Sequence, residues 1–162
     1  MAVNMNQFKQ TAVVGQVDLD NTPREAMYTC LFKDASDTEG TTLVPGEPVK
    51  LVDLGSSDIV GPPIVDEMAD DNDGGAFGVN IYNTKDNSAV DGEIVQIAGE
   101  GAVVFLNSGA AISRGAKVAA VLATPGNVIT ATTEDELGVA LDKATGANEL
   151  IRVRIKPVAV ST

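Results

Sequence analysis

The residues whose types and spacing best suit chemistry are the acidic residues that follow Val65. Five carboxylates and one asparagine lie within residues 66–73, and oxygen ligands of this kind bind hard cations such as Ca²⁺. The spacing does not fit an EF-hand loop. When Gly75 takes the place of the required glycine, Gly74 falls on a ligand position and Ile81 replaces the bidentate acid. We therefore interpret the segment as a solvated acidic loop and predict no metal site.

Other catalytic arrangements find little support in the composition. The chain contains no histidine, which excludes Ser-His-Asp and Cys-His catalysis and histidine-bound zinc within it. The single cysteine, Cys30, lies in an apolar run, so we interpret it as a small buried residue. Acids placed for glycoside hydrolysis would lack an aromatic platform, since tryptophan is absent. The glycines at 99–101 and 74–75 do not form a phosphate-binding motif. We predict that the protein is not an enzyme and binds no cofactor.

The charge balance restricts the partners. The chain has 11 basic and 23 acidic residues, giving a net charge of -12 and a pI near 4.2. Such a surface repels phosphate backbones, so we expect no binding to nucleic acid. No segment has the length and apolar character of a membrane span, and residues 1–10 do not resemble a signal peptide. We therefore expect no membrane partner.

The elements that would position any site are short strands. From Pro45 onward, apolar segments alternate with turn residues every eight to twelve positions, which is typical of all-β sandwiches and barrels. The sequence predicts a mainly β fold, a small antiparallel β-barrel or sandwich with an extended N-terminal arm and little helix. No internal repeat is convincing. The expected divisions are an arm and connecting segment (1–44), a β-barrel domain (45–157) and a C-terminal tail (158–162).

Local signals define several of these elements. The glycines at 99–101 predict a hairpin between residues 93–98 and 102–106, and Thr124-Pro-Gly126 predicts a type II turn. Residues 24–33 fit either a short helix or a strand, and a helix there would span about residues 22–32. In the last strand, the residues at even positions from 150 to 154 should point away from the core, and those at odd positions from 151 to 155 should point into it.

The candidate contact residues lie at the two ends of the chain. The arm has enough apolar side chains to dock on another surface but too few to fold alone. Arg152 and Arg154 share the outward face of one strand. In so acidic a chain, we expect them to pair with carboxylates of a neighbouring strand or of a partner chain.

The order of the motifs along residues 46–156 resembles that of capsid cement, or decoration, proteins of tailed bacteriophages. In that family a Gly-Asp-x-Val strand, a Gly-x-x-Val hairpin, a Gly-Val-Ala strand and a closing Val-Arg-Leu strand recur in the same order. The segments that carry the resemblance are Gly92-Glu-Ile-Val-Gln-Ile97, Gly101-Ala-Val-Val-Phe-Leu106, Ile112-Ser-Arg-Gly-Ala-Lys-Val118, Gly126-Asn-Val-Ile-Thr130, Leu137-Gly-Val-Ala-Leu141 and Ile151-Arg-Val-Arg-Ile155.

The resemblance implies a structural virion protein, made in the host cytoplasm, that binds the outer capsid surface and bridges major capsid proteins as a dimer or trimer. The arm would add a strand to a neighbouring sheet edge. The residues expected to contact the capsid or a partner are Val13, Val14, Val17, Leu19, Arg152 and Arg154.

Two other functions remain open. A receptor-binding or fibre-attachment module on the phage surface would use loops at residues 66–78 and 142–149, although aromatic residues are scarce there. A small β-barrel enzyme would use its carboxylates.

Overall fold

The computed structural model describes residues 12–34, 42–52, 61–68, 76–81, 88–132 and 136–156. Within these ranges, the strands form two closed five-stranded barrels and a two-stranded sheet of β2 (Thr42–Leu43) and β6 (Ala89–Val90). The described helix is a single 3-10 turn, η2 (Arg24–Ala26), and no helix in these parts has the length and apolar character that crossing a membrane needs. The prediction of a mainly β protein with little helix is confirmed.

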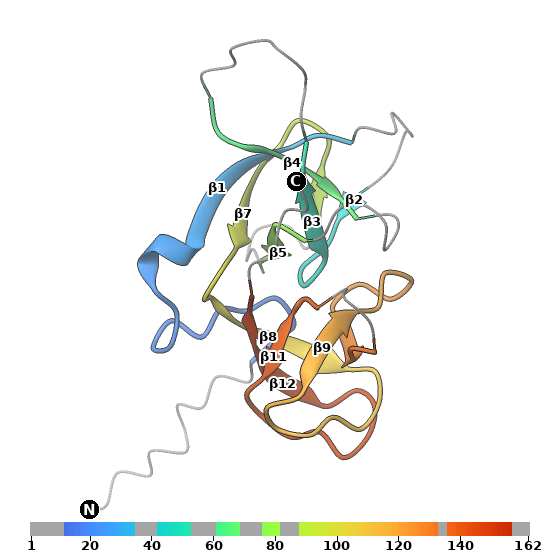
Figure 1. The fold of residues 1–162 in the computed structure, drawn as a ribbon. Helices are drawn as coiled ribbons and strands as arrows, with labels where there is room; N and C mark the ends of the chain where they lie inside the picture. Colours follow the sequence, from blue (N-terminus) through green and yellow to red (C-terminus); the bar gives the residue numbers. More distant parts are fainter. Residues whose placement is uncertain are drawn as a thin grey trace, which may run out of the picture.

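The first barrel, drawn in the upper half of Figure 1, has the strand order β1-β4-β3-β5-β7. β1 and β4 run parallel, and every other pair of neighbours is antiparallel. Its strands are β1 (Met27–Phe32), β3 (Pro48–Leu51), β4 (Ile64–Glu67), β5 (Gly78–Asn80) and β7 (Ile94–Ala98).

The second barrel lies below the first in Figure 1 and has the order β10-β8-β12-β11-β9. Again one pair, β8 and β10, is parallel and the others are antiparallel. Its strands are β8 (Val103–Ser108), β9 (Lys117–Ala120), β10 (Asn127–Thr130), β11 (Gly138–Ala140) and β12 (Leu150–Ile155).

The second barrel repeats the first. When the five strands of each barrel are counted along the chain, the first and third are parallel in both, and the four antiparallel pairs also correspond. The registers of the five ladders agree as well. Corresponding pairs include Leu31–Ile64 and Asn107–Asn127, Leu31–Ile94 and Asn107–Leu150, and Val49–Gly78 and Val118–Gly138. The structure therefore contains an internal repeat where the sequence showed none.

One pair of corresponding glycines meets the same steric constraint in both barrels. A Cβ atom on Gly78 would lie 2.5 Å from the carbonyl oxygen of Ala98 on the neighbouring strand. A Cβ on Gly138 would meet the carbonyl oxygen of Arg154, which is the residue that corresponds to Ala98. Both positions therefore require glycine because the adjacent backbone is too close for any side chain.

Two expectations differ from the structure, and one open alternative is decided by it. β1 lies inside the predicted arm of residues 1–44 and is a strand of the first barrel, so the expected boundary at residue 45 falls between two strands of one barrel. Of the two alternatives for residues 24–33, the strand is right, since β1 forms there after a single 3-10 turn. The hairpin at 99–101 is wrong, because β7 and β8 pair with strands of different barrels and these glycines connect the two.

Other local predictions hold. β9 and β10 pair across Thr124–Gly126, where the Asn127 N–H donates to the carbonyl oxygen of Thr124 over 3.1 Å and Gly126 has a φ of 81°. β12 alternates as expected, with the residues at 151, 153 and 155 buried.

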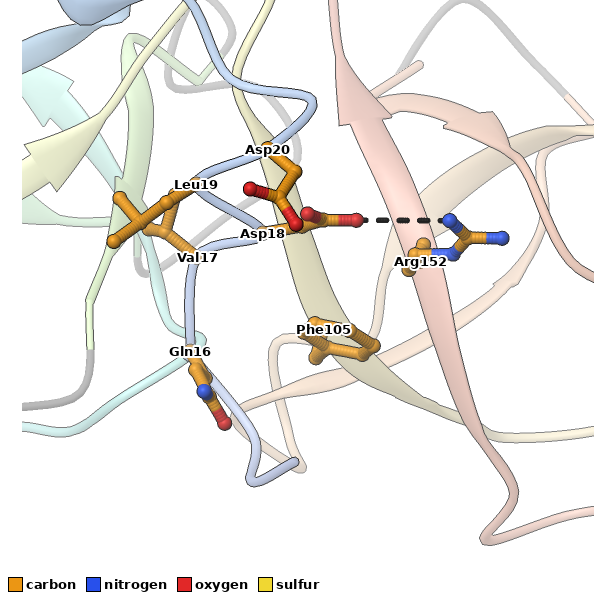
Figure 2. A pocket seen from close by; sticks show the side chains of 7 residues that line it. All are labelled: Gln16, Val17, Asp18, Leu19, Asp20, Phe105 and Arg152. Carbon is orange, nitrogen blue, oxygen red and sulfur yellow. Dashed lines mark ion pairs between the residues drawn. The ribbon is translucent and has the colours of Figure 1, made fainter. Parts of the chain in front are cut away.

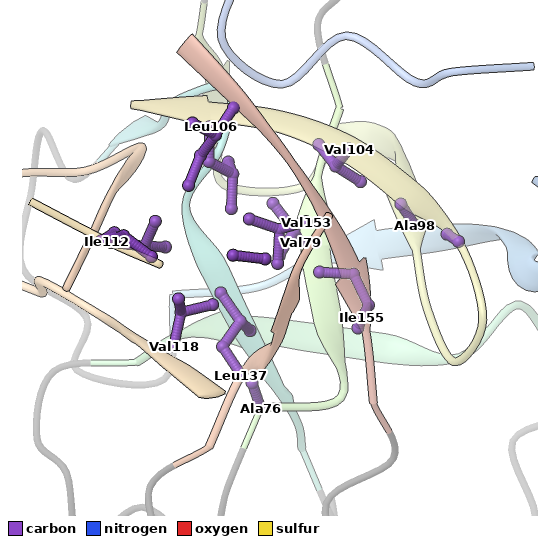
Figure 3. Close-up of a cluster of buried hydrophobic side chains, with 14 of the residues drawn as sticks. Ala76, Val79, Ala98, Val104, Leu106, Ile112, Val118, Leu137, Val153 and Ile155 are labelled. Atoms are coloured by element: carbon purple, nitrogen blue, oxygen red, sulfur yellow. The ribbon is translucent and has the colours of Figure 1, made fainter. Parts of the chain in front are cut away.

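The core is divided between the barrels and the contact between them. Buried side chains of the first barrel and of the neighbouring β2 form one cluster: Cys30, Phe32, Leu43, Val49, Val65, Val95 and Ile97. A second cluster fills the second barrel and continues to Ala26, Val79 and Ala98 of the first (Figure 3). The two barrels therefore bury apolar surface against each other, which favours a fixed arrangement of the pair.

Candidate partner-binding surface

The segment that precedes β1 occupies an open edge of the second barrel. β8 pairs with β10 only through Asn107 and Ser108, which leaves residues 103–105 without a neighbour on that side. Residues 15–18 fill this gap and form an isolated bridge between Val17 and Val104. The hydrogen bonds run from the Gly15 N–H to the Phe105 oxygen (2.8 Å), from the Phe105 N–H to the Gln16 oxygen (2.9 Å) and from the Asp18 N–H to the Val103 oxygen (2.8 Å).

Val14 and Gly15 hold this segment at the junction of the barrels. Gly15 has a φ of 76°, and a Cβ there would lie 2.7 Å from the Cβ of Pro45 in the first barrel. Val14 packs between Gly46 of the first barrel and Gly126 of the second, since a Cβ on either glycine would lie within 2.7 Å of its Cγ1. The segment therefore contacts both barrels and braces one against the other.

Arg152 connects the segment to the outer face of β12. Its Nη2 and Nε atoms lie 2.7 and 2.8 Å from the two carboxylate oxygens of Asp142, and Nη1 lies 3.6 Å from Oδ2 of Asp18. This bidentate pairing lowers the pKa of Asp142 below its usual range and raises the pKa of Arg152. Arg152 is therefore a fixed cation between two carboxylates.

Figure 2 shows the open pocket that these groups form. Its lining comes from the segment and from β8 and β12: Gln16, Val17, Asp18, Leu19, Asp20, Phe105 and Arg152. Leu19 is 78% exposed, although the preceding residue, Asp18, bonds to Val103 of β8. The arrangement presents an apolar side chain beside acidic groups and a neutralised arginine, which suits contact with another protein.

Residues 34–155, most of the chain, match the phage cement protein family. The chain belongs to that family. As a cement-family member it is a structural protein of a phage virion. No curated protein sequence matches it. A crystal structure similar to it is that of the head fiber gp8.5 N base in bacteriophage phi29, which is 12% identical, with a TM-score of 0.49, over 80% of this chain and 92% of that chain.

The contact residues predicted from the sequence of this cement-family member are only partly brought together. Val17, Leu19 and Arg152 line the same pocket. Val14 is packed between the barrels, whereas Val13 is 39% exposed. Arg154 is exposed two positions along β12. Arg152 pairs with Asp142 and Asp18 of its own chain, which lie in connecting segments and not on a neighbouring strand as expected. That these residues contact a partner stays a prediction.

Sequence reasoning missed the residues that organise the surface. Asp18 and Asp142 fix Arg152, and Phe105 supplies the backbone to which Gly15 and Gln16 bond. The apolar residues up to Val17 indicated a segment that could dock on another surface, but nothing in the sequence assigned Val104 as its partner. The long separation between residues 15–18 and β8 explains the omission, because a local pattern does not identify a distant partner strand.

The sequence also led to expectations about the cysteine and about metal binding, which concern other parts of this cement-family member. Cys30 is buried as expected, and burial raises the pKa of its thiol to about 11, which leaves it unreactive at neutral pH. Among the described residues, no group of three or more acids or cysteines is placed to hold a metal ion. Most of the acidic loop at residues 66–73 lies outside the described ranges.

Proposed function

We propose that this protein cements the outside of a phage head by bridging neighbouring major capsid proteins, as a dimer or trimer and without catalysing a reaction. Membership of the cement protein family carries the proposal. The fold supplies two similar barrels with separate outward surfaces, so one chain offers contacts in more than one direction. Several contacts of standard size, about 800 Å² per partner, would combine into tight attachment.

The exposed residues and the charge support an outer position. Leu19 and Val13 present apolar side chains next to the braced segment, where burial against a capsid protein would stabilise the complex. The net charge of -12 disfavours adhesion to DNA and discourages association between particles.

A binding experiment tests the proposal. Purified protein is added to mature heads that lack it, the bound fraction is measured by sedimentation, and the bound position is determined by electron microscopy. We expect saturable binding on the outer surface and heads that survive heating better. Binding to the inner surface, or no binding, would contradict the proposal.

Matched variants locate the contact. Leu19→Ser and Val13→Ser should weaken binding to heads by about 10- to 100-fold, because each removes an apolar side chain from the contact. Ile129→Ser is the control, since Ile129 is 40% exposed on β10 and does not line the pocket that contains Leu19. Equal effects of all three variants would remove the support for this surface.

A further inference from the structure

The internal repeat reveals an unfilled edge in the first barrel. Thr29 of β1 corresponds to Phe105 of β8, since Thr29 pairs with Gln96 as Phe105 pairs with Arg152. Residues 15–18 fill the edge at Phe105. Among the described residues, no segment fills the corresponding edge at Met27–Thr29, because β4 joins β1 only at Leu31 and Phe32.

The direction of the backbone groups confirms that this edge is open. The Leu31 N–H donates to the Pro63 oxygen on the β4 side, whereas the Phe32 N–H donates to the Glu93 oxygen on the β7 side. Backbone groups alternate sides along a strand, so the N–H and C=O of Thr29 point to the β4 side, beyond the start of β4. Within the described part of the chain, these two groups have no backbone partner.

An apolar row lies next to this edge in the first barrel alone. Leu31 pairs with Ile64 on one side and Ile94 on the other, and Ile94 is 58% exposed. The residues at the corresponding positions of the second barrel are Asn107, Asn127 and Leu150. An open edge beside half-buried and exposed apolar side chains is a surface that strand addition uses, with main-chain bonds for affinity and side chains for specificity.

We propose that residues 1–11 of a second copy add as a strand to the Met27–Thr29 edge, so that each chain gives its N-terminus to a neighbour. This deepens the self-association in the proposed function. Residues 1–11 directly precede the segment that fills the corresponding edge of the second barrel. They include Val3, Met5 and Phe8 for contact with the apolar row.

The charge of residues 1–11 also favours their addition to the Met27–Thr29 edge. Residues 1–11 carry Lys9 and no carboxylate, whereas the whole chain has a net charge of -12. A positively charged N-terminal segment is therefore attracted to the acidic body of another copy, while two bodies repel each other. An acidic partner strand would lack this attraction.

Cysteine cross-linking tests the exchange in the full-length chain. Asn4→Cys and Thr29→Cys variants are purified separately, mixed and oxidised mildly; the native Cys30 is buried and does not compete. We expect a disulfide-linked dimer in the mixture and none when Asn4→Cys is mixed with Ile129→Cys. Absence of the dimer would overturn the proposal. A double variant that instead forms an intrachain disulfide at high dilution would also overturn it.

Sedimentation of variants gives a second measurement. Deleting residues 1–11 and the substitution Thr29→Pro should each weaken self-association at least tenfold, while Thr29→Val should not. Proline removes an N–H that has no backbone partner in the described barrel, and thermal unfolding would verify that the variant folds. Unchanged association in both variants would refute strand exchange.

The two proposals fail separately. Cross-linking and sedimentation use the free protein, whereas the proposed function is tested by binding to heads. A chain that binds heads without exchanging residues 1–11 would overturn only the exchange. A chain that exchanges them but does not bind heads would overturn only the cement function.

Discussion

The first and second barrels keep the same strand order and register while filling their cores in opposite ways. Cys30 and Phe32 point into the first barrel, and the corresponding residues of the second are Leu106 and Ser108. All four are fully buried. The larger of the two side chains therefore stands at position 32 in the first barrel and two positions earlier, at 106, in the second. The fold thus requires a filled volume more than a particular residue at each place.

The different placement of the large side chain also changes the hydrogen bonds that each core makes. The Ser108 hydroxyl donates to the carbonyl oxygen of Gly146 over 2.7 Å and accepts from the Glu149 N–H over 3.0 Å. The second barrel thus uses this position to bond the loop before β12, whereas Phe32 fills space in the first. A buried hydroxyl is tolerated because both of its bonds are made.

The largest change in stability is expected when a core residue of the first barrel is replaced by the residue at the corresponding position of the second. Phe32→Ser should destabilise the protein by about 3–5 kcal/mol, because it leaves a cavity and an additional buried hydroxyl. Cys30→Leu in the same chain should recover part of the loss by restoring volume. Urea unfolding measures both, and Thr29→Ser, on the outward side of the strand, is the control. A recovery of zero would show that the two cores are not interchangeable.

The paired glycines give the next test. Gly78→Ala and Gly138→Ala should each cost about 1–3 kcal/mol, because the new Cβ would strike the backbone of the adjacent strand. Gly146→Ala is the control, since the nearest atom to its Cβ would be Oε1 of Glu149 at 3.9 Å. A cost at only one of the two positions in thermal unfolding would weaken the correspondence between the barrels.

A smaller change in stability is expected from residues on the outer faces of the two barrels. Gln96 occupies the place in the first barrel that Arg152 holds in the second, so Arg152→Gln should remove the pairing with Asp142 at a cost of about 0.5–1 kcal/mol, allowing for solvent screening. The pKa of Asp142 is lowered in the folded state. Its contribution is therefore fully present above its usual pKa of about 3.9 and disappears as the pH falls through the lower folded value.

Unfolding experiments at several pH values check this sign. The stability difference between the original protein and Arg152→Gln should be constant from neutral pH to about pH 5 and shrink below about pH 4. A difference that grows on acidification would show that another group, and not Asp142, is responsible.

The smallest effect concerns the turns before the last strand of each barrel. Gly92 and Asn148 correspond, since their N–H groups donate to Phe32 and Ser108, and both have positive φ, 84° and 62°. Gly92→Asn should therefore change stability by less than about 0.5 kcal/mol, whereas Gly92→Val should cost about 1–2 kcal/mol. A large cost for asparagine in thermal unfolding would contradict the equivalence.

The sequence was sufficient for what depends on neighbouring residues. Alternation in residues 150–155 identified the buried face of β12, and Thr124-Pro-Gly126 identified the turn between β9 and β10. The repeat was hidden because the matched core residues differ in size. Its remaining signals were Gly46 and Gly115, each three positions before a buried valine, and the Gly-Val pairs at 78 and 138.

Features that join distant parts of the chain were beyond such reasoning. The pairing of residues 15–18 with β8 depends on a gap left by β10, and that gap follows from the register of a parallel pair. Likewise, Arg152 has Asp142 and Asp18 as partners because of the fold around it, and no spacing in the sequence distinguishes these acids from the others.

The position of residues 15–18 has a consequence for synthesis on the ribosome. The strands of the first barrel all emerge before β8, so that barrel can close while the second is still being translated. Residues 15–18 leave the exit tunnel before β8 does and must wait, because Val103–Phe105 do not yet exist as a template. Joining of residues 15–18 to β8 would therefore be a late step in the maturation of each newly made chain.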